Sequence, residues 1–179
     1  MKVELIQTVP GDQLRLSRLM QLYAYDFSEF MAWDLAEDAV FHGPDALSLE
    51  LLESWRHPYL LRAEGHLAGF AILDERSRLT GDTTVMDVGE FFVLRKYRRQ
   101  GIGSACAALA FDLFPRKWEV CQVAKNSAAT AFWRKAILSY TGGRFQETLL
   151  DDERWRGPVQ SFDARRPLGT DGEHRPLKS

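Results

Sequence analysis

The sequence predicts an α+β fold in which helices flank a central, mixed and mostly antiparallel sheet. Helix-like and strand-like segments follow one another without any internal repeat, and a tight turn at Glu64-Gly65-His66 joins two strands as a hairpin. In the middle of the chain, a strand runs through a basic, glycine-containing loop directly into a helix. The length of 179 residues, 45% of them hydrophobic, suits a single core. We therefore expect one domain over residues 1–164 and a flexible tail over residues 165–179, which are rich in proline, glycine and charge.

The first part of the chain predicts a strand followed by helical segments. Residues 2–8 alternate enough to form a strand, and Asp12 is a suitable N-cap for the helix that follows. A second helical stretch is expected over Leu47–Trp55, after a Gly-Pro-Asp turn. The next three predicted strands are Tyr59–Ala63, Leu67–Leu73 and Val85–Leu94.

The second part of the chain predicts two helices interleaved with the last strands. An alanine-rich helix follows the glycine loop and ends near Pro115. A strand is then expected at Trp118–Ala124, followed by a helix from about Ser127 to Ile137. The strands Phe145–Leu150 and Val159–Phe162 are expected to close the sheet as an antiparallel pair.

Composition excludes several classes of protein. The formal net charge of -2 is not the basic footprint of a nucleic-acid-binding domain. No run of about 18 apolar residues predicts a membrane span, and the N-terminal segment reads as a strand rather than a signal peptide. The two cysteines, Cys106 and Cys121, form no CxxC pair, so we expect neither a disulfide scaffold nor a metal site. A cytoplasmic protein is the expectation.

The loop from Arg95 to Ser104 is the most informative segment. Backbone N–H groups at the start of a helix lack intrahelical partners, and the helix dipole adds positive potential, so such a helix start favours a phosphate group. Gly101 and Gly103 are expected to permit unusual backbone angles and the close approach of a ligand. Four bases add charge that suits phosphate: Arg95, Lys96, Arg98 and Arg99.

Two familiar phosphate motifs do not match this loop. The GxxxxGK[ST] pattern of Walker-type nucleotide sites is absent, and Cys106 stands where the dinucleotide pattern GxGxxG requires its third glycine. A glycine-rich helix start beside a solvated basic turn is the non-functional alternative. The density of bases that lead into the glycines favours an anion site instead.

The run Arg98-Arg99-Gln100-Gly101-Ile102-Gly103 resembles the (Q/R)-x-x-G-x-(G/A) signature of the GNAT superfamily of N-acetyltransferases. One strand downstream, Asn126-Ser127-Ala128-Ala129 followed by an aromatic pair is similar to a second motif of that superfamily, and the element order up to about residue 163 also fits. The resemblance implies a GNAT-like fold with splayed strands at the cofactor site and acetyl-coenzyme A as co-substrate. The cofactor-binding residues it implies are Phe91, Phe92, Val93, Arg98, Arg99, Gln100, Gly101, Ile102, Gly103, Ser104, Asn126 and Trp133.

The resemblance implies direct attack of an amine on the acetyl thioester, without a covalent enzyme intermediate. A lysine-like amine has a pKa near 10.4, so a base must remove a proton close to neutral pH. Asp87 and Glu90 are the candidates, and strand alternation predicts that they point to opposite faces. Glu90 is preferred, because a carboxylate beside two phenylalanines is costly unless it has a role. A strand-edge charge and an ion-pair partner are the structural alternatives.

The proton donor to the leaving thiolate is an open question. Many relatives place a tyrosine in the aromatic pair after the Asn helix, but this chain has Trp133, whose indole cannot act as that acid. Tyr140 is the substitute of choice and Tyr97 a weaker one, and solvent is a third option. The substitution also favours the alternative function of a non-catalytic acyl-coenzyme A sensor or partner domain.

The acceptor is expected to be a small-molecule amine rather than a protein. The region after the first helix shapes the acceptor pocket in relatives, and here it is aromatic and ends in acids that suit a cationic amine, although such aromatic residues are usually core. These aromatic residues are Tyr23, Tyr25, Phe27, Phe30 and Trp33. The acids are Asp34, Glu37 and Asp38. By analogy with relatives, a homodimer through the C-terminal strands is compatible with the sequence.

Overall fold

The structure, a computed structural model, describes residues 1–41 and 53–165. The elements follow the predicted order, with ends shifted by a few residues. They are β1 (Val3–Gln7), α1 (Gln13–Phe27), β2 (Arg56–Ala63), β3 (His66–Asp74), β4 (Val85–Val93), α2 (Ile102–Leu113), β5 (Lys117–Cys121), α3 (Ser127–Thr141), β6 (Phe145–Asp151) and β7 (Arg156–Asp163). Most of the helical stretch predicted at Leu47–Trp55 and nearly all of the predicted tail lie outside the described residues.

The described strands form one seven-stranded sheet in the order β1-β2-β3-β4-β5-β7-β6. Only the pair β4–β5 is parallel, and every other neighbouring pair is antiparallel. The α2 helix crosses between the two parallel strands, as a parallel connection requires. The predicted mixed and mostly antiparallel sheet is confirmed.

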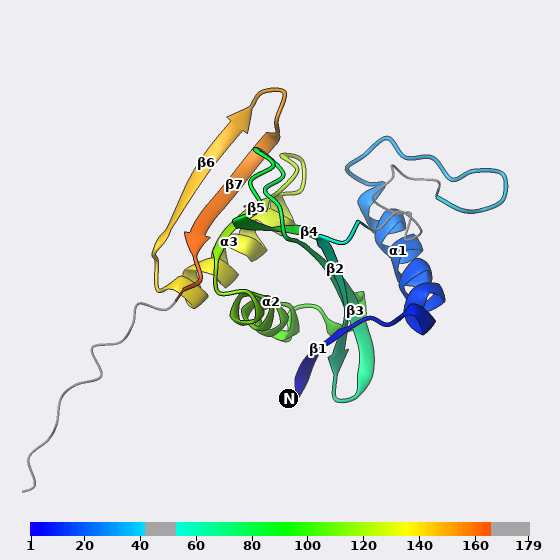
Figure 1. The fold of residues 1–179 in the computed structure, drawn as a ribbon. Coiled ribbons are helices and arrows are strands. Elements are labelled where there is room, and N and C mark those ends of the chain that lie inside the picture. Colours follow the sequence, from blue (N-terminus) through cyan, green and yellow to red (C-terminus); the bar gives the residue numbers. More distant parts are fainter. Residues whose placement is uncertain (42–52, 166–179) are drawn as a thin grey trace, which may run out of the picture.

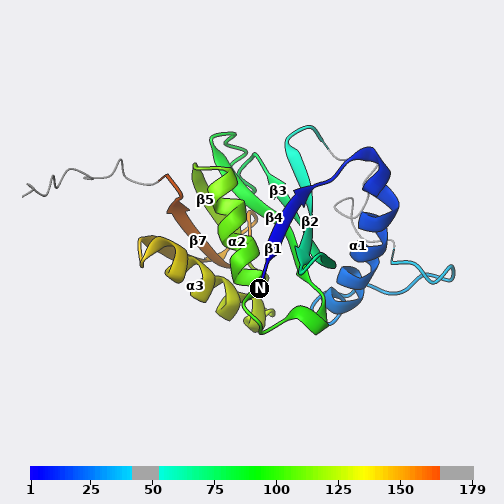
Figure 2. The same cartoon turned by 90° about the horizontal axis from the view of Figure 1, so that it is seen from below.

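Helices cover both faces of the sheet (Figures 1 and 2). Helix α1 lies on one face, where Leu16 and Met20 pack against Phe70 and Phe92. Helices α2 and α3 lie on the opposite face and build the larger core, which contains Phe111, Trp118, Trp133 and Ile137. The sheet therefore separates two apolar layers, and β4 contributes side chains to both of them.

The parallel strands β4 and β5 stay together over only three residue pairs, from Val85↔Lys117 to Asp87↔Glu119. Beyond Asp87, β4 continues to Val93 paired with β3, whereas β5 continues paired with β7. The two strands therefore part at the middle of the sheet (Figure 1). This confirms the splayed strands that the family resemblance implied.

A β-bulge interrupts β4 where the strands part. Ile72 of β3 pairs with Glu90, but its neighbour Leu73 pairs with Val88, so Gly89 is the extra residue. A Cβ at Gly89 would lie 2.5 Å from Oδ2 of Asp74. Only glycine fits between this buried carboxylate and the strand, which explains the residue at the bulge.

The predicted capping role of Asp12 is wrong in detail. Asp12 stands at the N-cap position of α1, but its side chain makes no cap hydrogen bond to the helix. Its carboxylate instead accepts a hydrogen bond from the Val9 N–H at 3.1 Å and pairs with Arg15. The short 3₁₀ turn Pro10–Asp12 precedes α1, and the Asp12 carboxylate caps the start of this turn rather than the start of α1.

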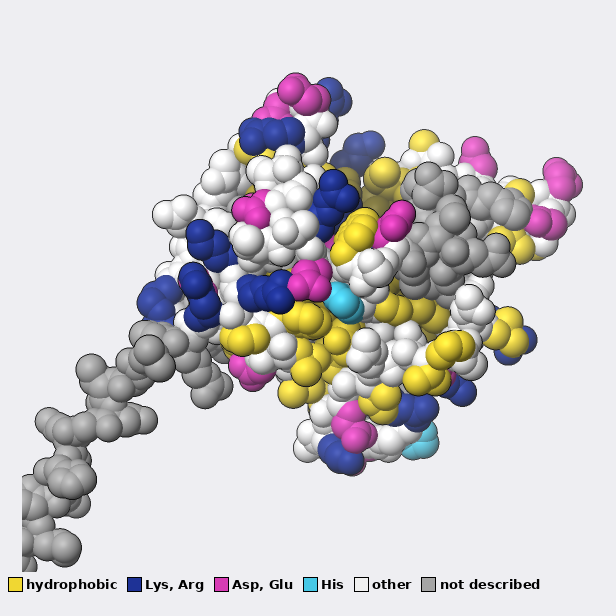
Figure 3. Space-filling model, in the orientation of Figure 1, with side chains coloured by type: hydrophobic (Ala, Val, Ile, Leu, Met, Phe, Trp, Pro, Cys, Tyr) yellow, Lys and Arg dark blue, Asp and Glu magenta, His cyan; other side chains and the backbone are white. Residues whose placement is uncertain are grey.

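Charged side chains of both signs lie next to one another on the face shown in Figure 3. Among the described residues, Arg116 pairs with Glu75, and Arg154 pairs with Asp152 at 2.6 Å in the turn between β6 and β7. This face therefore mixes the two charges.

The close approach of β3 and β4 predicts a strict requirement for glycine at position 69. A Cβ there would lie 1.9 Å from the carbonyl oxygen of Phe92, so backbone atoms would have to move. We expect Gly69→Ala to lower the free energy of unfolding by about 3 kcal/mol, as measured by guanidinium denaturation. Gly11→Ala is the control, because nothing lies within 4 Å of the added methyl. Equal midpoints for the two variants would contradict the prediction.

Candidate functional site

The basic loop joins β4 to α2 and forms a cradle of backbone N–H groups. A 3₁₀ turn, Arg95–Tyr97, follows β4, and α2 begins at Ile102. Its first intrahelical hydrogen bond runs from the Ala105 N–H to the Gly101 carbonyl at 3.0 Å. The amides from Gly101 to Ser104 precede that bond, so helix geometry leaves them without intrahelical acceptors. Such a helix start attracts an anion.

The two loop glycines have different roles. Gly101 has a φ of +80°, a left-handed conformation that favours glycine, and Arg99 also lies in this region at +60°. Gly103 is helical, and a Cβ there would lie 3.1 Å from the ring of Phe132 in α3. The expectation of an unusual backbone angle therefore holds for Gly101 but is wrong for Gly103, which is needed for helix packing.

Arg98 is held by protein groups on three sides. Its Nε donates a 2.7 Å hydrogen bond to the carbonyl of Val93, its Nη2 pairs with Asp26, and its guanidinium lies 5.6 Å from the ring centroid of Phe92. The Gln100 amide similarly donates to the Lys96 carbonyl at 2.6 Å. These side chains fix the shape of the loop, so the anion cradle itself consists of the backbone amides.

Asp26, in the last turn of α1, connects this helix to the loop. It accepts hydrogen bonds from Arg98 and from Arg95, whose Nη2 lies 2.7 Å from Oδ1. Partial burial opposes ionisation of Asp26, but the hydrogen bonds from the two arginines outweigh it and hold its pKa below the ordinary value. The α1 helix and the loop are thus joined by a charged clamp.

The aromatic pair in α3 packs against β4. Phe91 stacks on Phe132 at 5.8 Å and meets the edge of Trp133 at 5.0 Å. Trp133 is 6% exposed and belongs to the core under α2 and α3. Phe92 faces the other way, into the α1 layer. Both phenylalanine side chains are therefore engaged in packing, and the backbone of β4 is what the gap between β4 and β5 presents.

Asn126 caps α3. Its Oδ1 accepts a hydrogen bond from the Ala129 N–H at 2.9 Å. The cap uses the carbonyl oxygen, while the amide group of the same side chain has two donors. The pairing of β5 with β4 ends at Glu119, β5 itself ends at Cys121, and α3 begins at Ser127. Asn126 therefore lies shortly after the point where the two strands part.

Asp87 is buried in β4 and pairs with Arg78. The Arg78 Nε lies 2.9 Å from Oδ2 of Asp87, and its Nη2 donates to the Gly89 carbonyl at 3.1 Å. Oδ1 of Asp87 is buried and has no hydrogen-bond partner among the described residues. Burial raises the pKa of Asp87 to about 6 against the opposing effect of Arg78. The indole of Trp155 covers the Arg78 guanidinium at 5.4 Å.

Glu90 lies just beyond the bulge and contacts α1. Burial raises the pKa of the Glu90 carboxyl. The hydroxyl of Tyr23 and the charges of Arg78 and Arg56 stabilise the ionised carboxylate and counteract this rise only in part. A carboxylate with a raised pKa is a better match to proton transfer near neutral pH.

The expectation that Asp87 and Glu90 point to opposite faces is wrong. Arg78 and Asp74 influence the ionisation of both carboxylates, which places the two groups in one cluster. The reason is the bulge at Gly89, because one extra residue reverses the alternation of the strand. Strand periodicity alone gives no indication of such a bulge.

Tyr140 contacts α2 and β7. The Tyr140 hydroxyl donates to Oδ1 of Asp112 in α2 at 2.9 Å, and its ring packs on Phe111 and Phe162. Tyr140 lies seven residues beyond Trp133 in α3, about 10 Å along the helix axis. Tyr97, in the 3₁₀ turn, packs against the α2 and α3 core.

Sequence reasoning missed two residues of the site, Asp26 and Arg78. It placed Tyr23 in the aromatic region of the acceptor pocket and did not connect it with Glu90. Only tertiary contacts connect them to β4 and the loop, because 67 residues separate Tyr23 from Glu90. The sequence offers one indication of this site: Asp26 is a charged residue between the aromatic residues Tyr25 and Phe27.

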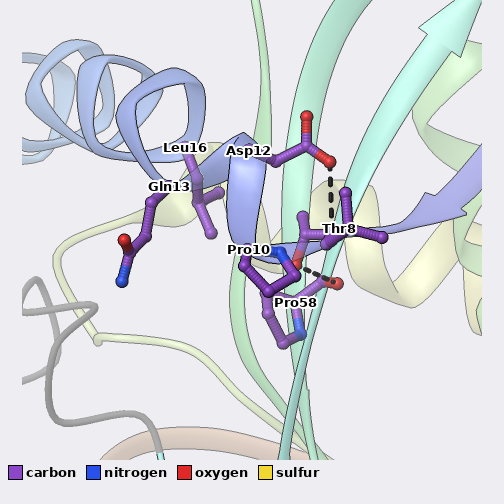
Figure 4. A pocket seen from close by; sticks show the side chains of 7 residues that line it. Thr8, Pro10, Asp12, Gln13, Leu16 and Pro58 are labelled. Carbon is purple, nitrogen blue, oxygen red and sulfur yellow. Dashed lines mark hydrogen bonds between the residues drawn. The ribbon is translucent and has the colours of Figure 1, made fainter.

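A pocket of about 160 Å³ lies at the opposite end of α1 (Figure 4). Its lining includes Pro10, Leu16 and Pro58, and the Thr8 hydroxyl donates to the Pro58 carbonyl at 3.2 Å. Its distance from Asp26 along the helix is about 15–20 Å, so it is separate from the loop. The described residues contain no acid, histidine and cysteine cluster that could hold a metal ion, and no helix among them could cross a membrane.

The burial of Asp87 predicts a stability that falls as pH rises. Its pKa is raised from 3.8 to about 6, so the folded state binds the proton of Asp87 more tightly than the unfolded state does. The stability that this proton contributes is fully present below about pH 4 and is lost as pH rises through about 6. Relative to Asp87→Asn, the wild-type free energy of unfolding should fall by roughly 2–3 kcal/mol between pH 4 and pH 7, as measured by urea denaturation.

Asp163→Asn is the control, because the pKa of Asp163 is shifted in the opposite direction from that of Asp87. The hydrogen bond from Arg165 lowers the pKa of Asp163 to about 2, so its contribution is present above the unfolded value and is lost as pH falls. Parallel stability curves for the wild type and Asp87→Asn would contradict the assignment of Asp87 as a buried acid.

Comparison with known proteins identifies the family and the fold. A model described as the Acetyltransferase (GNAT) family matches residues 19–137, which is more than half of the chain. No curated protein matches the chain by sequence. A GNAT-family acetyltransferase from Desulfovibrio desulfuricans has a similar structure, with a TM-score of 0.60 at 13% identity over 91% of this chain and 99% of the other.

Two further solved structures contain coenzyme A. The PaiA N-acetyltransferase from Thermoplasma acidophilum has a TM-score of 0.60 at 12% identity, over 91% of this chain and 99% of the other. An aminoglycoside acetyltransferase has a TM-score of 0.63 at 14% identity, over 90% of this chain and 95% of the other. These TM-scores show a shared fold, and the family model matches the segment from α1 to α3 that carries the loop and both motifs. The chain belongs to the acetyltransferase (GNAT) family.

Proposed function

We propose that the protein is an N-acetyltransferase that moves the acetyl group of acetyl-coenzyme A to a primary amine by direct attack in a ternary complex. The observation that carries the proposal is the arrangement at β4. An anion cradle stands at one end of the gap between β4 and β5, and a carboxylate with a raised pKa lies on the strand beside it. The coenzyme A bound to the structurally similar enzymes supports the same use of this loop.

The cofactor would bind along the elements that surround the gap. The backbone amides from Arg99 to Ser104 would hold the pyrophosphate, and the pantetheine arm would pair with the backbone of Phe91 to Val93. The Asn126 amide group would reach the same arm from the start of α3. Arg98 would keep the loop in shape through Val93 and Asp26.

The chemistry would follow from these positions. The amine nitrogen attacks the thioester carbonyl carbon, a C–N bond forms, and the C–S bond breaks with its electron pair on sulfur. Glu90 takes the proton from nitrogen, directly or through a water, and a backbone N–H near Phe91 stabilises the oxyanion. The thiolate takes a proton from solvent, because Trp133 carries no acidic group and Tyr140 bonds to Asp112.

A small cationic amine is the proposed acceptor. An aromatic wall extends from β4 over the end of α1, with Phe27 5.1 Å from Tyr23 and 5.5 Å from Trp33. Asp34 and Glu37 follow this wall and would favour a cation. An amine-rich aminoglycoside, the type of acceptor named for one similar enzyme, belongs to this class. The cytoplasm stays the proposed location, on the sequence grounds given above.

Gly101 provides a test of the cofactor site. We expect Gly101→Asp to bind acetyl-coenzyme A at least tenfold more weakly than Gly101→Asn, because only the first variant adds a negative charge at the anion cradle. Both side chains tolerate the left-handed backbone, so the pair is matched in size and conformation. Thermal stabilisation by the cofactor measures the difference. Equal stabilisation of both variants would show that the loop does not bind the cofactor.

Glu90→Gln tests the base. We expect turnover at saturating acetyl-coenzyme A and amine to fall about 100-fold with an unchanged KM for acetyl-coenzyme A, because the amide cannot accept the proton. Release of free thiol across a panel of amines measures turnover. Glu153→Gln, at an exposed position between β6 and β7, should behave as the wild type. Unchanged turnover in Glu90→Gln would rule out its role, and cofactor binding without release from any amine would favour a sensor domain.

A further inference from the structure

The ring of Tyr23 is fixed against the sheet by aromatic contacts. It meets Phe70 edge-on at 5.9 Å and 88°, and Phe92 at 5.9 Å and 65°. Phe27, one turn later in α1, lies 5.1 Å away. These contacts leave the ring little freedom, so the direction of its hydroxyl group is set by the packing of α1 on β3 and β4.

The end of α1 is also fixed on its other side. Asp26 lies three residues after Tyr23, on a neighbouring part of the same helix surface, and pairs with Arg95 and Arg98 of the loop. One helical turn therefore contacts both the loop that forms the anion cradle and, through Tyr23, the carboxylate on β4.

Charged and polar groups face Glu90 from four elements. Tyr23 comes from α1, Arg56 from β2, Asp74 from β3, and Arg78 from the loop between β3 and β4. Arg56 and Arg78 have carboxylate partners of their own, Asp74 at 3.0 Å and Asp87 at 2.9 Å. The Tyr23 ring packs on Phe92, which lies two residues after Glu90 on the same face of β4, and the Tyr23 hydroxyl stabilises the ionised Glu90 carboxylate.

We propose that Tyr23 is a positioning residue that holds the Glu90 carboxylate in place for the amine. This inference rests on the proposed function, in which Glu90 is the base. A carboxylate has two oxygens, and a bond to one of them fixes the rotamer while the other accepts the proton of the amine. Tyr23 itself does not exchange a proton in the reaction, since burial and the Glu90 carboxylate raise its pKa above the ordinary value.

The decisive experiment follows Glu90 in the free enzyme. The full-length chain is labelled with ¹³C at the glutamate side-chain carboxyls, and the Glu90 signal is assigned with Glu90→Gln. In Tyr23→Phe the ring contacts stay and the hydroxyl is lost. Because the Tyr23 hydroxyl lowers the pKa of Glu90, its removal should move the titration of this signal to higher pH. Tyr25→Phe, at an exposed position of the same helix, should leave the titration unchanged.

The kinetic experiment tests the same role during turnover. Tyr23→Phe should shift the acidic limb of the kcat/KM profile for the amine to higher pH, with about tenfold lower kcat/KM on that limb and an unchanged KM for acetyl-coenzyme A. In a Glu90→Gln background, the same substitution should have no further effect, because Tyr23 acts through Glu90.

An unchanged Glu90 titration in Tyr23→Phe would overturn the proposal. An equal loss of activity at every pH would also overturn it, as would additive losses in the variant that combines Tyr23→Phe with Glu90→Gln. Thermal unfolding of each variant shows whether the fold is intact. The carboxyl titration needs no acceptor, so it decides the role of Tyr23 even where no amine is acetylated. The failure of the proposed function would instead appear as cofactor binding without thiol release, and the two failures are therefore distinguishable.

Discussion

The bulge at Gly89 is the constraint on which the rest of the site depends. The Asp74 carboxylate occupies the space that a Cβ at this position would need, so the strand carries one extra, side-chain-free residue there. The extra residue reverses the alternation of β4 and brings Glu90 to the same side as Asp87. It also lies where β4 and β5 cease to pair, so the carboxylates stand at the mouth of the gap between these strands.

The charged cluster on β3 and β4 adds little stability for the number of charges that it buries. Asp74 and Asp87 are almost completely buried, and their partners are Arg56 and Arg78. Removing two opposite charges from water often costs more than their attraction returns, and apolar side chains of similar volume would stabilise such a site as well or better. Buried carboxylates with raised pKa values beside a gap in a sheet are instead a feature of sites that move protons. The cluster therefore supports the proposed role of β4 in proton transfer.

Helix α1 joins the two halves of the site. Its apolar face packs on the sheet through Leu16, Leu19 and Met20, and its last turn carries Tyr23 and Asp26. Through these two side chains the helix contacts the carboxylate on β4 and the arginines of the loop. The motif residue Arg98 consequently belongs to the scaffold of the loop, through its contacts with Val93 and Asp26.

The sequence by itself determined the fold class, the order of the strands and helices in the described residues, and the basic, glycine-containing loop that leads into α2. These features follow from local patterns, namely strand and helix periodicity, turn residues and the spacing of the loop glycines. The structure alone decided the face to which Glu90 points, the packing role of Gly103, and the pairing of Tyr140 with Asp112. A bulge and a contact between distant elements depend on how the sheet and helices pack, and no local periodicity records that packing. For the same reason Tyr23, Asp26 and Arg78 became part of the site only when α1 and the loop after β3 came to lie against β4.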